Sequence, residues 1–246
     1  MKKILIIGAA SAIATETAKS FAKDGAKLFL VDINSERLNS VAKHIKVWAP
    51  NSEILNSPLD VNSFDKHCEV FENAVSALNG LDAILIAHGT LPDQKKTQED
   101  VNLIIKEFNT NGLSVISLAS IAANYFEKQK KGCIAAISSV AGDRGRQSNY
   151  IYGAAKGSIA IYFQGLRNRL FPSGVTVLTI KPGFVDTPMT AHLTKNPLFA
   201  SAESVGRGIY DSMISGKDIA YIPSYWRIIL TVVKLIPEKI FKRLKL

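Results

Sequence analysis

The chain contains 246 residues, 47% of them hydrophobic, and its formal net charge is +9; this length suits one domain with a large core. Two cysteines in predicted helix and strand exclude a disulfide framework, and four scattered histidines without partners at ligand spacing predict no metal site. The basic charge alone does not indicate nucleic-acid binding, because the sequence has no recognition motif or aromatic stacking surface.

The first predicted element is a strand at residues 3–7, followed at once by Gly8 and a helical pattern rich in small residues. Gly8 suits a tight turn, and the small side chains of Ser11 and Ala12 allow a pyrophosphate to approach the N–H groups of the helix N-terminus. A secretory signal with a small-residue cleavage site is the alternative. We favour the strand, because cleavage would remove the first element of a regular alternation.

The second predicted strand, residues 27–31, ends in Asp32. A carboxylate at this position can accept hydrogen bonds from an adenosine ribose. It also repels a 2′-phosphate, and Ile33 supplies no arginine to receive one, so NAD is expected as cofactor and NADP is the alternative. Arg37 lies nearby in sequence, but surface solubility explains it equally well.

Further strands are predicted at residues 53–58, 81–87, 132–138, 175–180 and 219–222, with helical patterns between them. This alternation predicts an α/β fold, a three-layer Rossmann fold with a doubly wound, mostly parallel seven-stranded sheet and helices on both faces. Residues 1–224 are expected to form a single catalytic domain and residues 225–246 a tail. Ligands are expected beyond the carboxyl ends of the strands.

Tyr152 and Lys156 lie four residues apart in a predicted helix, and Ser139 follows the strand that precedes this helix. Residues i and i+4 share a helix face, so the ammonium group can lower the pKa of the phenol from about 10 toward neutrality. Such a phenol can act as a general acid or base. The spacing of Tyr152 and Lys156 also occurs by chance in many helices, and the surrounding motifs decide its meaning.

Taken together, the motifs resemble the short-chain dehydrogenase and reductase family over nearly the whole chain. The matching segments are the glycine motif at 8–14, Asp60-Val61, Asn109-Thr110-Asn111-Gly112, the trio Ser139, Tyr152 and Lys156, and Pro182-Gly183-Phe184-Val185-Asp186-Thr187. The chain departs from the family at Ala12 and Ala14, which replace two glycines, and at residues 86–89, where Ile-Ala-His-Gly replaces Asn-Asn-Ala-Gly.

The resemblance implies an NAD(P)-dependent oxidoreductase acting on a carbonyl or alcohol. Tyr152 is expected to protonate the carbonyl oxygen, Ser139 to hydrogen-bond that oxygen, Lys156 to bind the nicotinamide ribose, and Asn109 to hold a water that links Lys156 to solvent. The implied cofactor-binding residues are Gly8, Ser11, Ala12, Ile13, Asp32, Asp60, Val61, Ala87, His88, Gly89, Tyr152, Lys156, Pro182, Gly183, Val185 and Thr187. His88 either lines the nicotinamide pocket or is satisfied by local hydrogen bonds. A partner-binding or cofactor-sensing module is the non-enzymatic alternative, against which the intact trio argues.

The loop between Ser139 and Tyr152 contains Arg144 and Arg146. Arginine suits phosphate recognition, so both are candidate substrate residues. A solvated charged loop explains them equally well.

The tail from residue 225 is apolar and basic at once, too short and too interrupted to span a membrane. It suits a helix lying on an anionic membrane surface; packing over the substrate pocket or across a subunit interface are the alternatives. Residues 138–246 contain the runs Ser-Ser-Val-Ala-Gly-Asp-Arg (138–144), Tyr-Gly-Ala-Ala-Lys (152–156) and Pro-Gly-Phe-Val-Asp-Thr-Pro-Met-Thr-Ala-His-Leu (182–193), with Ile236-Pro237 and Ile240-Phe241. With these runs the segment most resembles the reductase component of decaprenylphosphoryl-ribose 2′-epimerase, which reduces a keto-sugar on a polyprenyl phosphate. We therefore expect a keto-reductase for a lipid-linked or phosphorylated sugar, with a soluble acyl or small ketone substrate as the alternative.

The family also implies a homodimer or homotetramer. The expected location is the cytoplasm, with peripheral contact at the inner face of the membrane.

Overall fold

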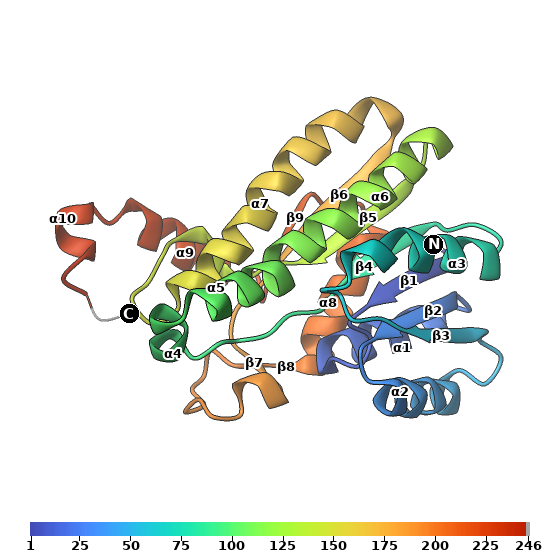
Figure 1. The fold of residues 1–246 in the computed structure, drawn as a ribbon, viewed down its shortest axis with the longest axis horizontal. Helices are drawn as coiled ribbons and strands as arrows, with labels where there is room; N and C mark the ends of the chain where they lie inside the picture. Colours follow the sequence, from blue (N-terminus) through green and yellow to red (C-terminus); the bar gives the residue numbers. More distant parts are fainter. Residues whose placement is uncertain (245–246) are drawn as a thin grey trace.

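The computed structural model describes residues 1–244 and contains a seven-stranded sheet of order β3-β2-β1-β4-β5-β6-β9 (Figure 1). The strands are β1 (Lys3–Ile7), β2 (Lys27–Asp32), β3 (Ile54–Pro58), β4 (Ala83–Ile86), β5 (Gly132–Ile137), β6 (Val175–Pro182) and β9 (Ile219–Ile222). All neighbouring strands of this sheet are parallel. The seven strands and the doubly wound α/β fold predicted from the sequence are confirmed.

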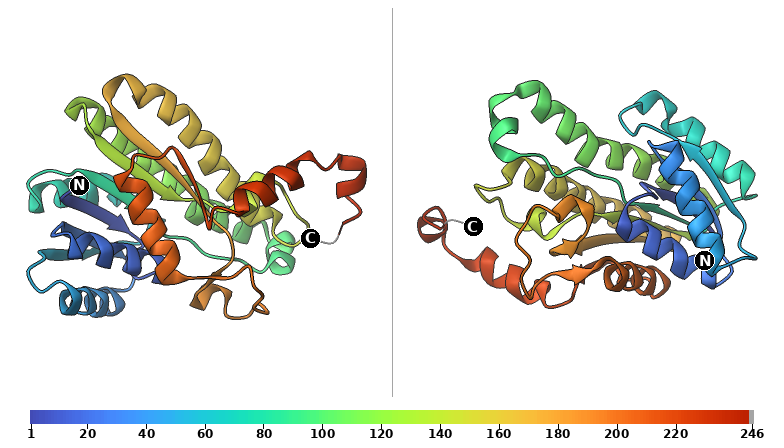
Figure 2. Two further views of the ribbon diagram at one scale, coloured as in Figure 1. Left: turned by 180° about the vertical axis from the view of Figure 1, so that it is seen from behind. Right: turned by 90° about the horizontal axis from the view of Figure 1, so that it is seen from below.

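Alternate residues of the central strand serve opposite faces of the sheet. Ile4 and Ile6 pack with α1 (Ala12–Lys23), α2 (Ser35–Trp48) and α8 (Ala202–Ile214). Leu5 and Ile7 pack with α3 (His67–Ala77), α6 (Ser114–Gln129) and α7 (Tyr150–Leu170). Because successive strand side chains point to opposite faces, a continuously apolar strand requires helices on both sides. Figure 1 and the left view of Figure 2 show helices on both sides of the sheet.

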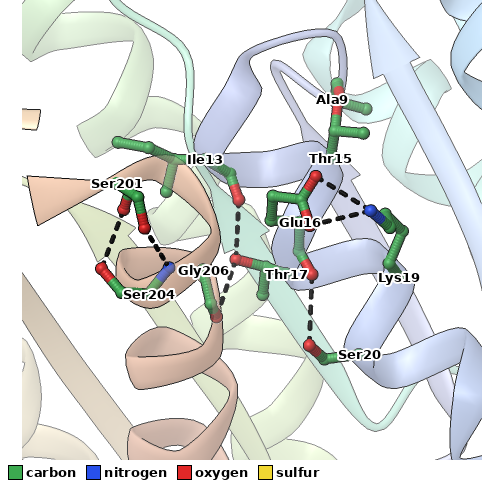
Figure 3. Close-up of polar contacts among 10 residues, drawn as sticks. All are labelled: Ala9, Ile13, Thr15, Glu16, Thr17, Lys19, Ser20, Ser201, Ser204 and Gly206. Carbon is green, nitrogen blue, oxygen red and sulfur yellow. Dashed lines mark hydrogen bonds and ion pairs between the residues drawn. The ribbon is translucent and has the colours of Figure 1, made fainter. Parts of the chain in front are cut away.

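Close contact between α1 and α8 fixes the helix that follows the glycine turn (Figure 3). The hydroxyl of Thr17 donates to the carbonyls of Ile13, at 2.9 Å, and Gly206, at 3.3 Å. A Cβ atom at Gly206 would lie 2.6 Å from the Cβ of Glu16. Glycine therefore permits the two helices to approach closely enough for a direct hydrogen bond between them.

Shorter elements surround the carboxyl edge of the sheet. They are α4 (Gln94–Glu99), α5 (Val101–Phe108), a π-helical turn η2 (Asn109–Leu113), the 3-10 turns η3 (Val140–Asp143) and η5 (Pro188–Thr190), and a two-stranded pair of β7 (Val185–Asp186) and β8 (Ala200–Ser201). The remaining 3-10 turns are η1 (Phe64–Lys66) and η4 (Phe171–Ser173).

The tail forms α9 (Trp226–Leu235) and α10 (Glu238–Phe241), which extend away from the sheet in all three ribbon views. Trp226 and Leu230 are buried in a small cluster with Val140, so the first turns of α9 pack against the segment that follows Ser139. Lys245 and Leu246, which belong to the predicted tail, lie outside the described residues. Within residues 1–244, none of the helices has the length and apolar character of a membrane span.

Candidate active site

The turn after β1 requires glycine. Gly8 has a φ of +77°, and a Cβ atom there would lie 2.5 Å from the backbone nitrogen of His88. The N–H groups of Gly8 and Ala9 both donate to the carbonyl of Val31, at 2.8 and 3.0 Å. Glycine adopts a positive φ with the lowest energetic cost, so this turn requires glycine at position 8.

The helix that follows presents its N-terminus at this turn. Ser11 is its N-cap and accepts a hydrogen bond from the N–H of Ala14 at 3.2 Å. Ala12 and Ile13 begin the helix, where backbone N–H groups have no intrahelical partner and favour an anion. Ala14 is completely buried in the core between helix and sheet. The methyl group of Ala14, which stands where the family motif has its third glycine, is thus accommodated by packing. The free N–H groups at the start of α1 fit a cofactor pyrophosphate.

A carboxylate and a guanidinium both contact the glycine turn. Asp32, at the end of β2, accepts from the N–H of Ala10 at 3.0 Å and from the N–H of Asn34 at 3.3 Å. Arg37 donates to the carbonyl of Ala10 at 3.2 Å. Surface solubility explained Arg37 equally well at the level of sequence, and only the fold brings its side chain to this turn.

Asp60 and Val61 follow the next strand along the edge. The carboxylate of Asp60 accepts from the N–H of Asn62 at 2.9 Å, and the carbonyl of Val61 lies 3.0 Å from Nε2 of the buried His67. Asn62 in turn reaches the hydroxyl of Thr110 in η2, at 3.0 Å. These bonds connect the loop after β3 to the turn that precedes α6.

Ser139, Tyr152 and Lys156 are brought together by β5, η3 and the first turns of α7. Ser139 is the N-cap of η3 and accepts from the N–H of Ala141 at 3.1 Å, and it hydrogen-bonds the side chain of Tyr152. The Nζ atom of Lys156 donates to the carbonyl of Ile137 at 3.0 Å and lies 5.8 Å from the centre of the Tyr152 ring. The predicted trio is therefore one constellation in space.

Burial dominates the protonation of this trio. It raises the pKa of Tyr152 to about 12, against a lowering by the hydrogen bond from Ser139. It lowers the pKa of Lys156 to about 8, so this side chain is mostly cationic at neutral pH. Burial thus opposes the lowered tyrosine pKa expected from the helix spacing, because removing a phenolate from water disfavours its ionisation. The phenol remains protonated and suits proton donation.

The asparagine beside Lys156 is Asn111, whereas the family motif led us to expect Asn109. A Cβ atom on Gly89 would lie 2.8 Å from Oδ1 of Asn111 and 3.2 Å from Nζ of Lys156, so both groups border the same point. Asn111 is fully buried and accepts from the N–H of Thr90 at 2.9 Å. Residues two apart in a helix project to different sides, so the choice between the asparagines requires the structure.

His88 is satisfied at one ring nitrogen only. Its Nε2 lies 2.7 Å from the hydroxyl of Ser114, and that hydroxyl donates to the carbonyl of Thr110 at 2.8 Å. Nε2 therefore carries the hydrogen, and Nδ1 is an acceptor. Burial, assisted by the charge of Lys156, lowers the pKa of His88 to about 3 and keeps the ring neutral. Nδ1 is buried without a hydrogen-bond partner among the described residues, as expected of an atom that a ligand or water completes.

The last predicted segment continues from β6. Pro182 ends this strand, and Gly183 lies against the indole of Trp226 so closely that a Cβ atom would overlap it. Val185 is buried in β7, and Thr187 caps η5 through Thr190. Ala87 and Gly89 complete the edge after β4. The predicted cofactor residues thus follow the carboxyl ends of the parallel strands, where open α/β sheets bind ligands.

The two arginines of the loop after Ser139 have different surroundings. Arg144 donates to the carbonyls of Val233 and Ile236 in the tail, at 2.8 and 2.7 Å. Arg146 borders a cavity between this loop and the tail. Of the two candidate phosphate ligands, Arg144 is thus occupied by protein carbonyls. Within the described residues no group of three or more histidine, cysteine, aspartate or glutamate side chains is placed to hold a metal ion.

The comparisons with known proteins agree with this geometry. The sequence pattern described as short chain dehydrogenase matches residues 2–198. An uncharacterised oxidoreductase of Mycobacterium tuberculosis is 27% identical over 98% of this chain and 96% of its own length. An uncharacterised oxidoreductase of Streptomyces coelicolor is 27% identical over 99% of this chain and 96% of its own length.

Among solved structures, levodione reductase superposes with a TM-score of 0.82 over 90% of this chain and 95% of its own, at 22% identity. That likeness concerns the fold alone. The match over residues 2–198 is what assigns the family. This chain belongs to the short-chain dehydrogenase family of NAD(P)-dependent oxidoreductases.

Proposed function

We propose that the protein is a keto-reductase whose substrate is a lipid-linked or phosphorylated sugar. The observation that carries the proposal is the attachment of an apolar, basic tail to the catalytic-serine loop: Trp226 and Leu230 pack on Val140, directly after Ser139. Such a surface beside the active site suits a polyprenyl-phosphate sugar, because the polar and apolar ends of that molecule occupy different environments.

In this mechanism Tyr152 donates its phenolic proton to the carbonyl oxygen while Ser139 hydrogen-bonds the same oxygen as negative charge develops. A bound nicotinamide would supply the hydride to the carbonyl carbon. The raised pKa of Tyr152, about 12, keeps the proton available for donation to the more basic alkoxide. Lys156 would bind the nicotinamide ribose, and Asn111, in place of Asn109, would hold a water between Lys156 and solvent.

The cofactor would be held by the residues that follow the strand ends. Gly8, Ser11, Ala12 and Ile13 would receive the pyrophosphate. The rest of the cofactor would contact Asp32, Asp60, Val61, Ala87, His88, Gly89, Pro182, Gly183, Val185 and Thr187. Thr187 would contact the carboxamide of the nicotinamide.

NAD is the proposed preference, with NADP as the alternative. The carboxylate of Asp32 supports NAD, because it would repel a 2′-phosphate, whereas Arg37 beside the same turn supports some use of NADP. The ratio of kcat/KM for NADH to that for NADPH tests the preference. Asp32→Asn is expected to lower this ratio and Arg37→Gln to raise it. A ratio below one in the unmodified enzyme would overturn the NAD preference.

The exposed face of α9 supports contact with a membrane surface. Ile228, Val232 and Leu235, at spacings of four and three residues, share one helix face and are 71%, 59% and 76% exposed. Each apolar side chain of this size contributes about 1.5–3 kcal/mol when fully removed from water. Arg227 and Lys234 lie beside the apolar stripe, and a cation near an anionic lipid surface adds about 1 kcal/mol. The three apolar side chains and the two cations together suit an anionic bilayer.

Vesicle sedimentation tests this contact. Ile228→Asp and Val232→Asp are expected to reduce binding to vesicles that contain phosphatidylglycerol, while Val47→Asp, which changes a similarly exposed side chain on α2, serves as control. Equal sedimentation of the Ile228→Asp variant and the unmodified protein would remove the membrane proposal.

Turnover decides the substrate class. The enzyme is incubated with reduced cofactor and either a polyprenyl-phosphate keto-sugar or a panel of soluble ketones and 3-oxoacyl compounds, and cofactor absorbance is followed. A kcat/KM at least 100-fold higher for the lipid-linked keto-sugar is the expected result. A preference for soluble 3-oxoacyl compounds would favour the second candidate function, which the family alone supports.

We propose a homo-oligomer whose interface includes α5 and α7. Members of this family typically form oligomers, and Val101, Ile105 and Ile161 on these two contacting helices are 69%, 53% and 72% exposed. Apolar side chains gathered on neighbouring helices favour burial against a second copy. Light scattering of Ile105→Asp and Ile161→Asp variants tests the interface, and an unchanged mass in both would exclude it.

A further inference from the structure

A small cavity lies between the loop that follows Ser139 and the tail. Its volume is about 150 Å³, and it is lined by Arg146 and Gln147 from the loop and by Glu238, Phe241, Lys242 and Leu244 from the tail. It is smaller than the roughly 300–1,000 Å³ of sites that enclose a whole small-molecule ligand. It therefore suits one chemical group of a larger molecule.

Arg144 holds the tail in the position that forms this cavity. Its guanidinium donates to the carbonyls of Val233 and Ile236 and lies 3.8 Å from the centre of the Phe241 ring. It also forms an ion pair with Glu238 at 3.0 Å. A cation at the carboxyl end of α9 is favoured by the helix dipole and by the unpaired carbonyls there. The tail wall of the cavity is thereby fixed to the loop.

The charges around the cavity leave an excess of positive charge. Arg144 pairs with Glu238, the carboxylate of the lining. Asp143, the carboxylate nearest in sequence to Arg146, is already engaged by Lys181 and, at 2.6 Å, by the hydroxyl of Tyr221. Burial lowers the pKa of Arg146, against an opposing effect of Asp143. Arg146 and Lys242 therefore face the cavity as cations whose neighbouring carboxylates are shared with other groups.

We propose that this cavity binds the phosphate group of an amphipathic substrate. Arg146 offers the planar pair of donors that matches phosphate oxygens, and Lys242 and Gln147 add further donors. The cavity volume of about 150 Å³ leaves room for a group of the size of a phosphate. Phe241 and Leu244 provide an apolar wall for the first carbons of an attached chain. The assignment deepens the proposed function and rests on it for the origin of the phosphate.

Binding without turnover tests the site directly. Isothermal titration calorimetry of the full chain with a ten-carbon prenyl monophosphate is expected to give a Kd that Arg146→Gln and Lys242→Gln each weaken about tenfold. Arg146→Lys, which keeps the charge, is expected to lose less affinity than Arg146→Gln. Inorganic phosphate is expected to compete with the prenyl compound. Lys43→Gln, an exposed charge loss on α2, is the matched control and is expected to have no effect.

Two results would overturn the assignment. In the first, Arg146→Gln and Lys242→Gln leave the Kd for the prenyl monophosphate unchanged while thermal unfolding shows them to be folded. In the second, both variants lose binding to phosphatidylglycerol vesicles but keep the prenyl monophosphate, which would identify the anion as a lipid headgroup. Different results would exclude the phosphate site and the proposed substrate class. Turnover of the polyprenyl-phosphate keto-sugar with an unchanged KM in Arg146→Gln removes only the site, and prenyl monophosphate binding in an enzyme that prefers soluble ketones removes only the function.

Discussion

The docking of the end of the tail on the loop that follows Ser139 depends on Arg144, whose side chain is only 14% exposed. Its Nη1 atom donates to tail carbonyls, including those of Val233 and Ile236, and its guanidinium stacks on Phe241. Nη1 has two hydrogens, so it makes at most two full bonds, each worth about 1.5 kcal/mol or slightly more. The cation–π contact adds roughly 0.5–1 kcal/mol, and the ion pair with the exposed Glu238 adds little.

Arg144→Gln is therefore expected to weaken the docking of the end of the tail by roughly 3–4 kcal/mol. Hydrogen exchange measured by mass spectrometry reports this locally. The amides whose hydrogen bonds lie in this segment are expected to lose protection by about two to three orders of magnitude; they are those of Ile236, Ile240, Phe241 and Lys242. Amides near Trp226 and Leu230 are expected to keep theirs, because those side chains are buried independently of Arg144.

Arg144→Lys provides a graded control, since it keeps the charge but not the planar set of donors. It is expected to show intermediate protection. Unchanged exchange in the Arg144→Gln variant would refute the reasoning. A uniform loss across the whole chain would also refute it, because it would mean that Arg144 contributes to global stability instead of local docking.

Three further predictions concern the candidate active site. Tyr152→Phe is expected to reduce turnover by about 10²–10⁴ because it removes the proton donor, while fluorescence titration shows cofactor affinity within about threefold of the unmodified enzyme; equal turnover would exclude Tyr152 as the acid. Asn111→Ala is expected to lower kcat at least tenfold and Asn109→Ala to leave it nearly unchanged, and the reverse order in steady-state kinetics would restore Asn109 to the site. The pKa of Lys156 is lowered to about 8 by burial, so its cation is present below that pH and lost above it. The kcat/KM for carbonyl reduction is therefore expected to fall above about pH 8, and Lys156→Arg to move that fall to higher pH; the same falling limb in Lys156→Arg would assign it to another group.

The fold was accessible from the sequence because its signals are local. An apolar run of four residues followed by Gly8 predicts β1 and its turn. The structure shows why glycine is required, since a Cβ atom at φ +77° would overlap the backbone of His88. The central strands β1, β4 and β5 are almost entirely apolar because helices cover both faces of the sheet, and that pattern is visible without coordinates.

The site was accessible only in part. The spacing of Tyr152 and Lys156 correctly placed both side chains near one another, with Ser139 in hydrogen-bond contact. It did not predict that burial would raise the pKa of Tyr152, because desolvation depends on every element packed around the phenol. Nor did the motif distinguish Asn111 from Asn109, because that choice depends on how η2 is oriented toward Gly89 and Lys156.

The sequence by itself determined the alternation of strands and helices, the glycine turn and the residue types of the catalytic trio, because each is encoded by neighbours within a few positions. Only the tertiary structure decided the fate of residues whose partners are distant in the chain. Arg37 reaches the glycine turn across 27 positions, and Arg144 contacts tail carbonyls about 90 positions away. Such contacts follow from the packing of whole elements, so no local pattern indicates that one loop arginine caps a helix while the other faces a cavity.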